Sequence, residues 1–237
     1  MRASIQKGSL FALNDFGQKQ FHQSNLSLST GSINFISGSL AGVISTFTTH
    51  PLDIVKTANQ AIVHSTSQAR FQAIPIWYGL TLSKGIFGPW ITLVPTLAGT
   101  ALYYGIKFAG FDLYMNYLNK LAQTFDLESK TESGVYLQAQ RGTAGMLAGL
   151  SGNFVCFPNN CVRKYLSTTN VLYAFHLRTE PPLKYFGAVK YLYKTYGLKR
   201  FYNGFGVNLL RNAPNTGIQF MVFLSLKDYY QGYQLKI

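Results

Sequence analysis

The sequence predicts an all-α membrane protein, with about four transmembrane helices and short amphipathic helices between them. Charged residues make up only 12% of the chain, about half of the usual share in a soluble domain. Residues 31–50, 85–106 and 142–162 carry no charge, and 201–226 carries only Arg211. A membrane helix needs roughly 20 mainly apolar residues, so each stretch is long enough to cross a bilayer. Core helices of a soluble protein are the alternative, but they usually keep a polar face.

An internal repeat supports this architecture. Two segments match at a constant offset of 107 residues, and each has two glycines followed by a proline-led polar motif. The matching residues are Gly38, Gly42, Pro51, Asp53 and Lys56 in the first segment and Gly145, Gly149, Pro158, Asn160 and Arg163 in the second. Glycines four residues apart share a helix face and let a neighbouring helix approach closely. We expect them to pack within their own repeat; a dimerisation surface is the alternative.

The repeat also predicts the domain organisation. We expect a polar N-terminal extension over 1–27, a first repeat over 28–120, a polar loop over 121–140 and a second repeat with a C-terminal tail over 141–237. The extension is mildly basic and lacks the apolar core of a secretory signal. It is also short and polar, so we do not expect further spans within it.

The net charge of +13 is unevenly distributed and predicts an orientation. Basic residues dominate 56–84 and 163–200, whereas acids balance bases in 120–141. Short basic loops stay on the side from which insertion is directed, so the two basic loops are expected together on one side. Both termini and 120–141 then lie on the other side. No nucleic-acid-binding module accompanies the positive charge, which argues against a nucleic-acid partner.

The residue types that usually carry catalysis or bind metals form no recognisable pattern. The two cysteines, Cys156 and Cys161, and the four histidines have no metal-ligand spacing. Hydrolase, metalloprotease and phosphate-loop motifs are absent from the sequence. We therefore expect no enzymatic activity, no metal site and no cofactor.

The proline-led motif has a mechanical interpretation. A proline inside a helix removes a backbone hydrogen bond and kinks the axis. In the first repeat, Asp53 and Lys56 follow Pro51 by two and five residues and share roughly one face beyond the kink. Repeated around a ring of helices, each base could reach the acid of the next helix and close the ring by salt bridges. A proline and a charge pair that simply end a helix are the alternative.

This motif resembles the signature P-x-[DE]-x-x-[KR] of the mitochondrial carrier family. The segments Tyr196-Gly197 and Tyr202-Asn203-Gly204 resemble a second family element, and Lys84-Gly85 and Trp90-Ile91-Thr92 match it more loosely. The resemblance covers about residues 31–231. It implies carrier-like repeats with two gates, and it assigns the matrix-side gate to Pro51, Asp53, Lys56, Gln60, Pro158, Asn160 and Arg163.

The chain departs from the family pattern at both gates. The family has three repeats and six spans, whereas we expect two repeats and four spans here. Asn160 replaces the acid of the second signature. The opposite gate motif, [FY]-[DE]-x-x-[KR], keeps Asp112 but has Met115 for its base, and later keeps Lys227 but has Leu224 for its acid. One possible pair, Asp112–Lys227, remains at that gate.

The resemblance also suggests solute and lipid sites. Arg211 aligns with a family substrate contact, and the corresponding position of the first repeat is Gly99. Arginine matches carboxylate or phosphate, so a solute bound there is expected to be anionic. Alternatively, Arg211 pairs with Asp53 or a lipid phosphate, or extends to the matrix side. Family members bind cardiolipin at helix starts, which suggests lipid sites at Gly187 and Gly204.

Two functions compete on this evidence. The reading we favour from the sequence is a carrier-derived, non-transporting accessory subunit of a larger mitochondrial inner-membrane assembly, such as a respiratory-chain complex, with other membrane subunits as partners. The alternative is a working carrier for a small anionic metabolite, acting as an oligomer. Either reading places 56–84 and 163–200 in the matrix and both termini in the intermembrane space. An outer-membrane or peroxisomal location is a further alternative.

Overall fold

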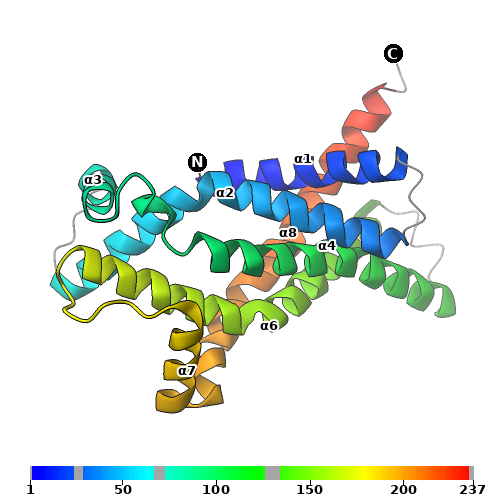
Figure 1. Cartoon of the computed structure of the whole chain (residues 1–237). Coiled ribbons are helices and arrows are strands. Elements are labelled where there is room, and N and C mark those ends of the chain that lie inside the picture. Colours follow the sequence, from blue (N-terminus) through cyan, green and yellow to red (C-terminus); the bar gives the residue numbers. More distant parts are fainter. Residues whose placement is uncertain (1, 24–28, 67–72, 126–133, 235–237) are drawn as a thin grey trace. The chain divides into compact units, whose positions relative to one another are not determined.

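The computed structural model describes residues 2–23, 29–66, 73–125 and 134–234, and this part of the chain is helical with no strand (Figure 1). The prediction of an all-α fold is therefore confirmed. The elements are α1 (Arg2–Gln23), α2 (Thr30–Thr66), α3 (Ala73–Lys84), η1 (Gly88–Trp90), α4 (Leu93–Thr124), α6 (Gly134–Ala174), α7 (Tyr185–Tyr196), η2 (Leu198–Tyr202) and α8 (Phe205–Gln234).

These elements group into two compact units. Unit 1 is drawn from Met1–Ser9, Gly42–Thr100 and Cys156–Asn203, and unit 2 from Leu10–Ala41, Ala101–Val155 and Gly204–Ile237. The helices α1, α2, α4 and α6 each contribute residues to both units. The expected matrix-side gate residues therefore fall in unit 1, and the opposite gate residues fall in unit 2.

Two of the repeat glycines, Gly38 and Gly145, pack as expected within unit 2. A Cβ atom added to Gly38 of α2 would stand 2.8 Å from Cδ2 of Phe108 on α4. One added to Gly145 of α6 would likewise stand 2.8 Å from Cδ2 of Phe220 on α8. In each repeat, a glycine of the first long helix (α2 or α6) thus packs against a phenylalanine of the second long helix (α4 or α8, called the even helices below). This confirms the packing interpretation.

Unit 1 contains two small cores, one beneath each short helix. The core under α3 includes Ile54 and Val55 of α2, Ile76 and Leu80 of α3, and Val171 of α6. The core under α7 joins Val162 and Leu166 of α6 to Ala188 and Leu192 of α7 and to Phe201. Both short helices end at a glycine. Gly85 and Gly197, directly after α3 and α7, adopt positive φ values of 75° and 71°, which end a helix.

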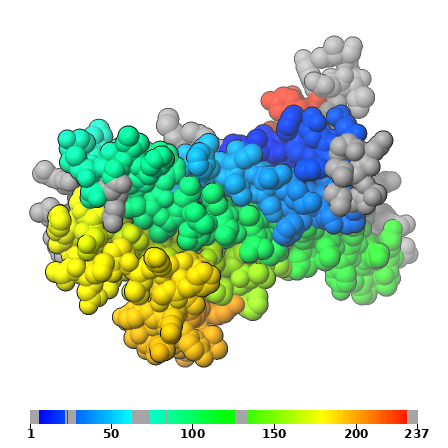
Figure 2. Space-filling view, viewed as in Figure 1, coloured from blue at the N-terminus to red at the C-terminus, as the bar shows by residue number. Residues whose placement is uncertain are grey.

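The two short helices differ in how amphipathic they are. In α7, Ala188 and Leu192 are buried while Phe186 and Tyr193 are exposed beside lysines, and the helix lies on the face shown in Figure 2. In α3 the exposed face is also apolar, since Ile74 is 83% and Leu82 is 69% exposed. The expectation of amphipathic helices fits α7 better than α3.

The N-terminal segment is a helix with a buried face, which the sequence analysis did not anticipate. Figure 1 shows α1 running alongside α2. In unit 2, Leu10, Phe11 and Asn14 of α1 are buried. A segment expected as a polar extension over 1–27 thus contributes to a core. Within the stretch expected as a polar loop, 121–140, α4 continues to Thr124 and α6 begins at Gly134, and residues 126–133 lie outside the described residues.

The apolarity of the described helices differs from the expectation of four apolar spans. Across the described ranges, no helix combines the length and the apolarity that a membrane crossing demands. The physical reason is that uncharged but polar side chains such as Asn34, Ser37 and Thr49 recur along the long helices.

Candidate functional site

The signature residues of both repeats lie in unit 1, on helices that continue through their prolines. Pro51 is inside α2 and Pro158 is inside α6. Asp53 is half-buried, whereas Lys56 and Gln60 are exposed. In the second repeat, Asn160 and Arg163 are both half-buried. The sequence motif is therefore placed in one unit, and the gate role of its residues remains a prediction.

Asn159, within the second signature, links three elements of unit 1. Its Nδ2 donates to the backbone oxygen of Pro95 on α4 at 3.2 Å. Its Oδ1 accepts from the hydroxyl of Tyr185 on α7 at 2.7 Å. The amide also lies so close to Gly99 that an added Cβ there would collide with it. Gly99 thus has a packing reason for being glycine, and its role as a solute contact stays a prediction.

A small cavity of about 350 Å³ lies between α6 and the segment after α7 in unit 1. Asn160 lines it with the basic side chains of Lys164 and Arg200 and with Asn203. Cys161 also lines it, and its thiol donates to the backbone oxygen of Arg200 at 3.6 Å. Cys161 is therefore at a cavity wall, whereas Cys156 is a buried core residue.

The two opposite-gate residues of unit 2 each pair with a residue that the sequence analysis did not single out. Lys227 of α8 forms a salt bridge and hydrogen bond with Asp15 of α1. Asp112 of α4 accepts a hydrogen bond from the buried amide of Asn34. The pair Asp112–Lys227 considered from the sequence is thus replaced by Asp15–Lys227 and Asn34–Asp112.

Asp15 is the centre of a small charge cluster. Lys19, one helical turn further along α1, pairs with its carboxylate at 3.1 Å, and the Asp15 side chain is 22% exposed. Burial raises the pKa of this carboxyl, but hydrogen bonds from Lys227 and Lys19 and their positive charges lower it by more. The net result is a pKa below the usual value of 3.8, so Asp15 is ionised at neutral pH.

A buried lysine lies in the aromatic core of unit 2. Lys107 of α4 is fully buried, and its Nζ donates to Oε1 of Gln219 on α8 at 3.4 Å. The ammonium nitrogen lies 5.0 Å from the centroid of the Phe220 ring and 5.4 Å from that of Phe11. The rings of Tyr104 and Phe108 lie within 6.0 Å. Cation–π attraction therefore contributes to holding this charge away from water.

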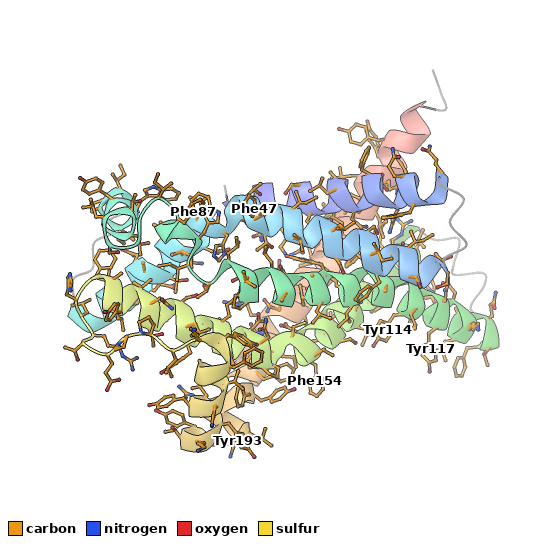
Figure 3. All side chains as sticks on the ribbon, viewed as in Figure 1. Phe47, Phe87, Tyr114, Tyr117, Phe154 and Tyr193 are labelled. Carbon is orange, nitrogen blue, oxygen red and sulfur yellow. The ribbon has the colours of Figure 1, made fainter. Side chains whose placement is uncertain are left out.

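A larger cavity of about 1070 Å³ opens on unit 2, between the start of α2 and the second half of α4. Asp112, Tyr114, Tyr117 and Lys120 line it from α4. Figure 3 shows Tyr114 and Tyr117 projecting on the same side of α4. The Tyr114 hydroxyl is 2.6 Å from that of Ser151 on α6, so the wall of this cavity is fixed by a hydrogen bond between helices.

Arg211 is an exposed residue of α8 within unit 2. Its guanidinium donates to Oδ1 of Asn208 at 3.4 Å, and Asn208 in turn donates to Asn153 of α6 at 3.3 Å. Arg211 is exposed, and a guanidinium has further N–H donors beyond the one in this bond. This geometry is compatible with the predicted anion contact, which stays a prediction.

The two predicted lipid glycines occupy different environments. Gly187 lies in the first turn of α7, where an added Cβ would meet only Leu183 at 3.7 Å. Gly204 precedes α8 with φ of 78°, and an added Cβ there would meet nothing within 4 Å. Both positions begin a helix, as lipid-phosphate contacts would require, and cardiolipin binding stays a prediction.

Sequence reasoning missed Asp15, Lys107 and Asn159 for different reasons. Asp15 lies in a segment that was read as a polar extension. Lys107 was not singled out, although a lone lysine beside an uncharged stretch is a signal for function. Asn159 lies inside the second signature, at a position that the motif P-x-[DE]-x-x-[KR] leaves open, and no sequence pattern marks it.

Comparison with protein families gives a match over both repeats. The family model described as "Mitochondrial carrier protein" matches residues 29–122 and 137–234. The two matched regions contain both proline-led signatures and both expected lipid glycines. The segment that forms α1 lies before the first matched region.

Several curated proteins are similar to this chain. The rat mitochondrial carnitine/acylcarnitine carrier protein is 26% identical over 208 residues, which cover 83% of this chain and 62% of that protein. The Arabidopsis thaliana mitochondrial carrier protein CoAc1 is 25% identical over 222 residues, 87% of this chain and 63% of its own length. The Arabidopsis thaliana mitochondrial thiamine diphosphate carrier 1 is 21% identical, covering 96% and 70%. The chain spans a little over six-tenths of the length of the first of these relatives.

Proposed function

Because this chain belongs to the mitochondrial carrier family, we propose that it is a working carrier that moves a small organic anion across a membrane. The observation that carries the proposal is the family match over both repeats, which includes both gate signatures. Transport requires two gates that open alternately, and a solute must bind the intermediate states well enough to offset the contacts that are broken. The family is one of carriers rather than enzymes, which agrees with the expectation of no catalytic activity.

The names of the relatives support a small organic molecule as the solute. They are described as carriers of carnitine and acylcarnitine and of thiamine diphosphate. These solutes bear a carboxylate or phosphates together with a cationic centre. We propose a solute that carries at least one carboxylate or phosphate group, and the identities of 21 to 26% leave its exact structure to experiment.

Three features of the site favour an anion. The net charge of +13 attracts anions to the protein surface. The exposed guanidinium of Arg211 offers paired donors that match a carboxylate or phosphate. The buried ammonium of Lys107 adds a second positive charge in the same unit. We assign Arg211 as the main solute contact and Lys107 as a source of positive potential.

The accessory-subunit function that the sequence analysis favoured has weaker support. It rested on a missing repeat and on an incomplete set of gate charges, and Asp15 supplies one further acid to Lys227. The relatives are named as carriers, and none of those described above is named as a subunit of an assembly. We therefore prefer transport, with oligomerisation as part of that proposal.

The location follows the same proposal. We place the chain in the mitochondrial inner membrane, with the basic stretches 56–84 and 163–200 in the matrix and both termini in the intermembrane space. The positive-inside tendency supports that orientation. Cardiolipin is the proposed bound lipid, at Gly187 and Gly204, where helix starts can offer backbone N–H groups to phosphate.

Uptake into proteoliposomes tests the proposal. The full chain is reconstituted with cardiolipin and assayed for exchange of labelled carnitine, thiamine diphosphate and simple dicarboxylates. Saturable uptake of one anionic solute is expected, and Arg211→Ala should abolish it. The matched control is Arg178→Ala, because Arg178 pairs with Glu180 on the surface of unit 1.

Two results would contradict transport. Uptake that Arg211→Ala leaves unchanged would remove the assigned contact. Absence of uptake for every solute, together with migration of the native chain in a larger particle in mild detergent, would instead support the accessory-subunit function.

A further inference from the structure

The N-terminal helix shares a spaced pattern with the two even helices of the repeats. In α4, Gly105 is followed by Phe108 three residues later and by Asp112 four residues after that. In α8, the same spacing gives Gly217, Phe220 and Leu224. In α1, it gives Gly8, Phe11 and Asp15. The glycine–phenylalanine pair thus occurs three times and the acid that follows it twice, although α1 lies outside the regions that match the family model.

The three phenylalanines of this pattern meet in the core of unit 2. The ring centroids of Phe11 and Phe108 are 5.4 Å apart, and those of Phe11 and Phe220 are 5.3 Å apart. The third side of the triangle, Phe108–Phe220, is 5.7 Å. All three pairs are edge-to-face, with interplanar angles of 84°, 89° and 69°. Buried phenylalanines often pack edge-to-face, but nearly equal sides between sequence-equivalent residues are what a three-fold arrangement produces.

The polar contacts of α1 also involve positions equivalent to those of the gate motif on α4 and α8. Asp15 stands four residues after Phe11, the acid position of the gate motif, as Asp112 does after Phe108. Lys227 stands seven residues after Phe220, the base position. The salt bridge Asp15–Lys227 therefore joins the acid position of one helix to the base position of another.

A second link joins α1 to α4 through an amide. Gln18 occupies the base position of α1, seven residues after Phe11, and its Nε2 donates to Oδ1 of Asn34 at 2.7 Å. The same Asn34 donates to Asp112, the acid position of α4. The remaining base and acid positions are Met115 on α4 and Leu224 on α8, which are both apolar. The two apolar substitutions in the gate motif thus fall in one acid–base pair of positions, while Gln18 is a polar substitution that keeps a hydrogen bond.

We propose that α1 is a third equivalent of α4 and α8, and that Asp15 and Phe11 complete a three-helix gate in unit 2. This inference rests on the proposed carrier function for its consequence, which is that the gate opens only when Asp15 separates from Lys227 and the phenylalanine triangle parts. Lys107, whose ammonium lies over all three of these rings, is then uncovered with the gate.

Reversible cross-linking tests both the placement and the role of α1. In a chain with Cys156→Ala and Cys161→Ser, the pair Asp15→Cys with Lys227→Cys is treated with a short bifunctional methanethiosulfonate. The control pair is Phe16→Cys with Lys227→Cys, because Phe16 is the next residue of α1 and is 62% exposed. We expect the first pair to cross-link far faster than the control. We expect cross-linking to abolish solute uptake and reductant to restore it.

The outcomes separate this inference from the proposed function. Equal cross-linking of both pairs would overturn the placement of α1. Efficient cross-linking that leaves uptake unchanged would overturn its role as a gate. A chain without uptake would contradict the carrier function, while the cross-linking rates would still report on the placement. If the cysteine variants fail to fold, the charge swap Asp15→Lys with Lys227→Asp should recover the thermal stability that each single reversal loses, and no recovery would contradict the pairing.

Discussion

Thr92 and Gly204 share a left-handed backbone conformation, with φ of 64° and 78°, at equivalent positions of the two repeats. Each directly precedes an even helix, α4 or α8. A glycine adopts positive φ freely, whereas a β-branched residue there is strained. In unit 1, the Thr92 hydroxyl lies 2.8 Å from that of Ser167, and Thr96 donates to the Thr92 backbone oxygen at 2.7 Å. These bonds offset part of the strain.

The strain at Thr92 predicts a stabilising substitution. Asparagine tolerates the left-handed region better than threonine and retains a polar side chain, so Thr92→Asn should raise the free energy of unfolding by about 1 kcal/mol. Thermal unfolding of the purified chain in detergent measures this. A fall in stability would mean that the Ser167 contact outweighs the backbone strain.

The same argument predicts the opposite effect in the second repeat. Gly204→Thr should lower the free energy of unfolding by about 1–2 kcal/mol, because an added Cβ meets no atom within 4 Å and only the backbone is strained. Gly206→Ala is the matched control, since Gly206 lies two residues away in α8 with equally open space. The control should leave stability unchanged or increase it slightly.

The glycine–phenylalanine contacts of unit 2 predict a cost for added volume. Gly145→Ala should lower the free energy of unfolding by about 1–3 kcal/mol, because its Cβ would stand 2.8 Å from Phe220 and force the ring to move. Gly31→Ala in α2 is the control, with nothing within 4 Å of the added methyl group. Chemical or thermal unfolding compares the two, and equal stabilities would show that the ring moves without cost.

The two hydrogen bonds of the Asn159 side chain in unit 1 predict a loss of stability when that side chain is removed. Asn159→Ala removes one hydrogen bond to Pro95 and leaves the Tyr185 hydroxyl without its acceptor, which should cost about 1–3 kcal/mol. Tyr185→Phe removes a single bond and should cost about 1 kcal/mol. Thermal unfolding of both variants shows whether Asn159→Ala destabilises the protein more than Tyr185→Phe does. A larger effect for Tyr185→Phe would mean that the Pro95 bond contributes little.

The Asp15 cluster predicts a pH dependence. A carboxyl whose pKa is lowered by folding contributes stability that is fully present above its unfolded pKa and lost as the pH falls through the folded value. The stability advantage of the wild type over Asp15→Asn should therefore be constant above about pH 5 and shrink below about pH 4. Unfolding measured across this range tests the sign, and an advantage that grows on acidification would contradict it.

How much the sequence predicts depends on whether a pattern is periodic and repeated. The helices around Pro51 and Pro158 and the glycine packing of Gly38 and Gly145 were predictable, because each occurs twice at one offset. The helical nature of α1 was not, since its apolar residues Leu10 and Phe11 are few and stand among polar ones. Its place in unit 2 depends on long-range contacts with Phe108 and Phe220.

The gate motif pointed to Asp112 and Lys227 but not to the residues that they contact. Each makes a polar contact within unit 2, Asp112 with Asn34 and Lys227 with Asp15, and their role in a gate stays a prediction. Their partners Asn34 and Asp15 come from elements distant in sequence, and no local spacing reveals such a pairing. Gly99 illustrates the converse, because alignment with Arg211 suggested a solute contact while its glycine is explained by the nearby amide of Asn159.

The burial of Lys107 has a consequence for ions near the aromatic core of unit 2. A positive charge in a region of low dielectric repels other cations strongly and attracts anions. An ammonium group among the rings of Phe11 and Phe220 would therefore oppose the approach of a cation to this core and favour that of an anion.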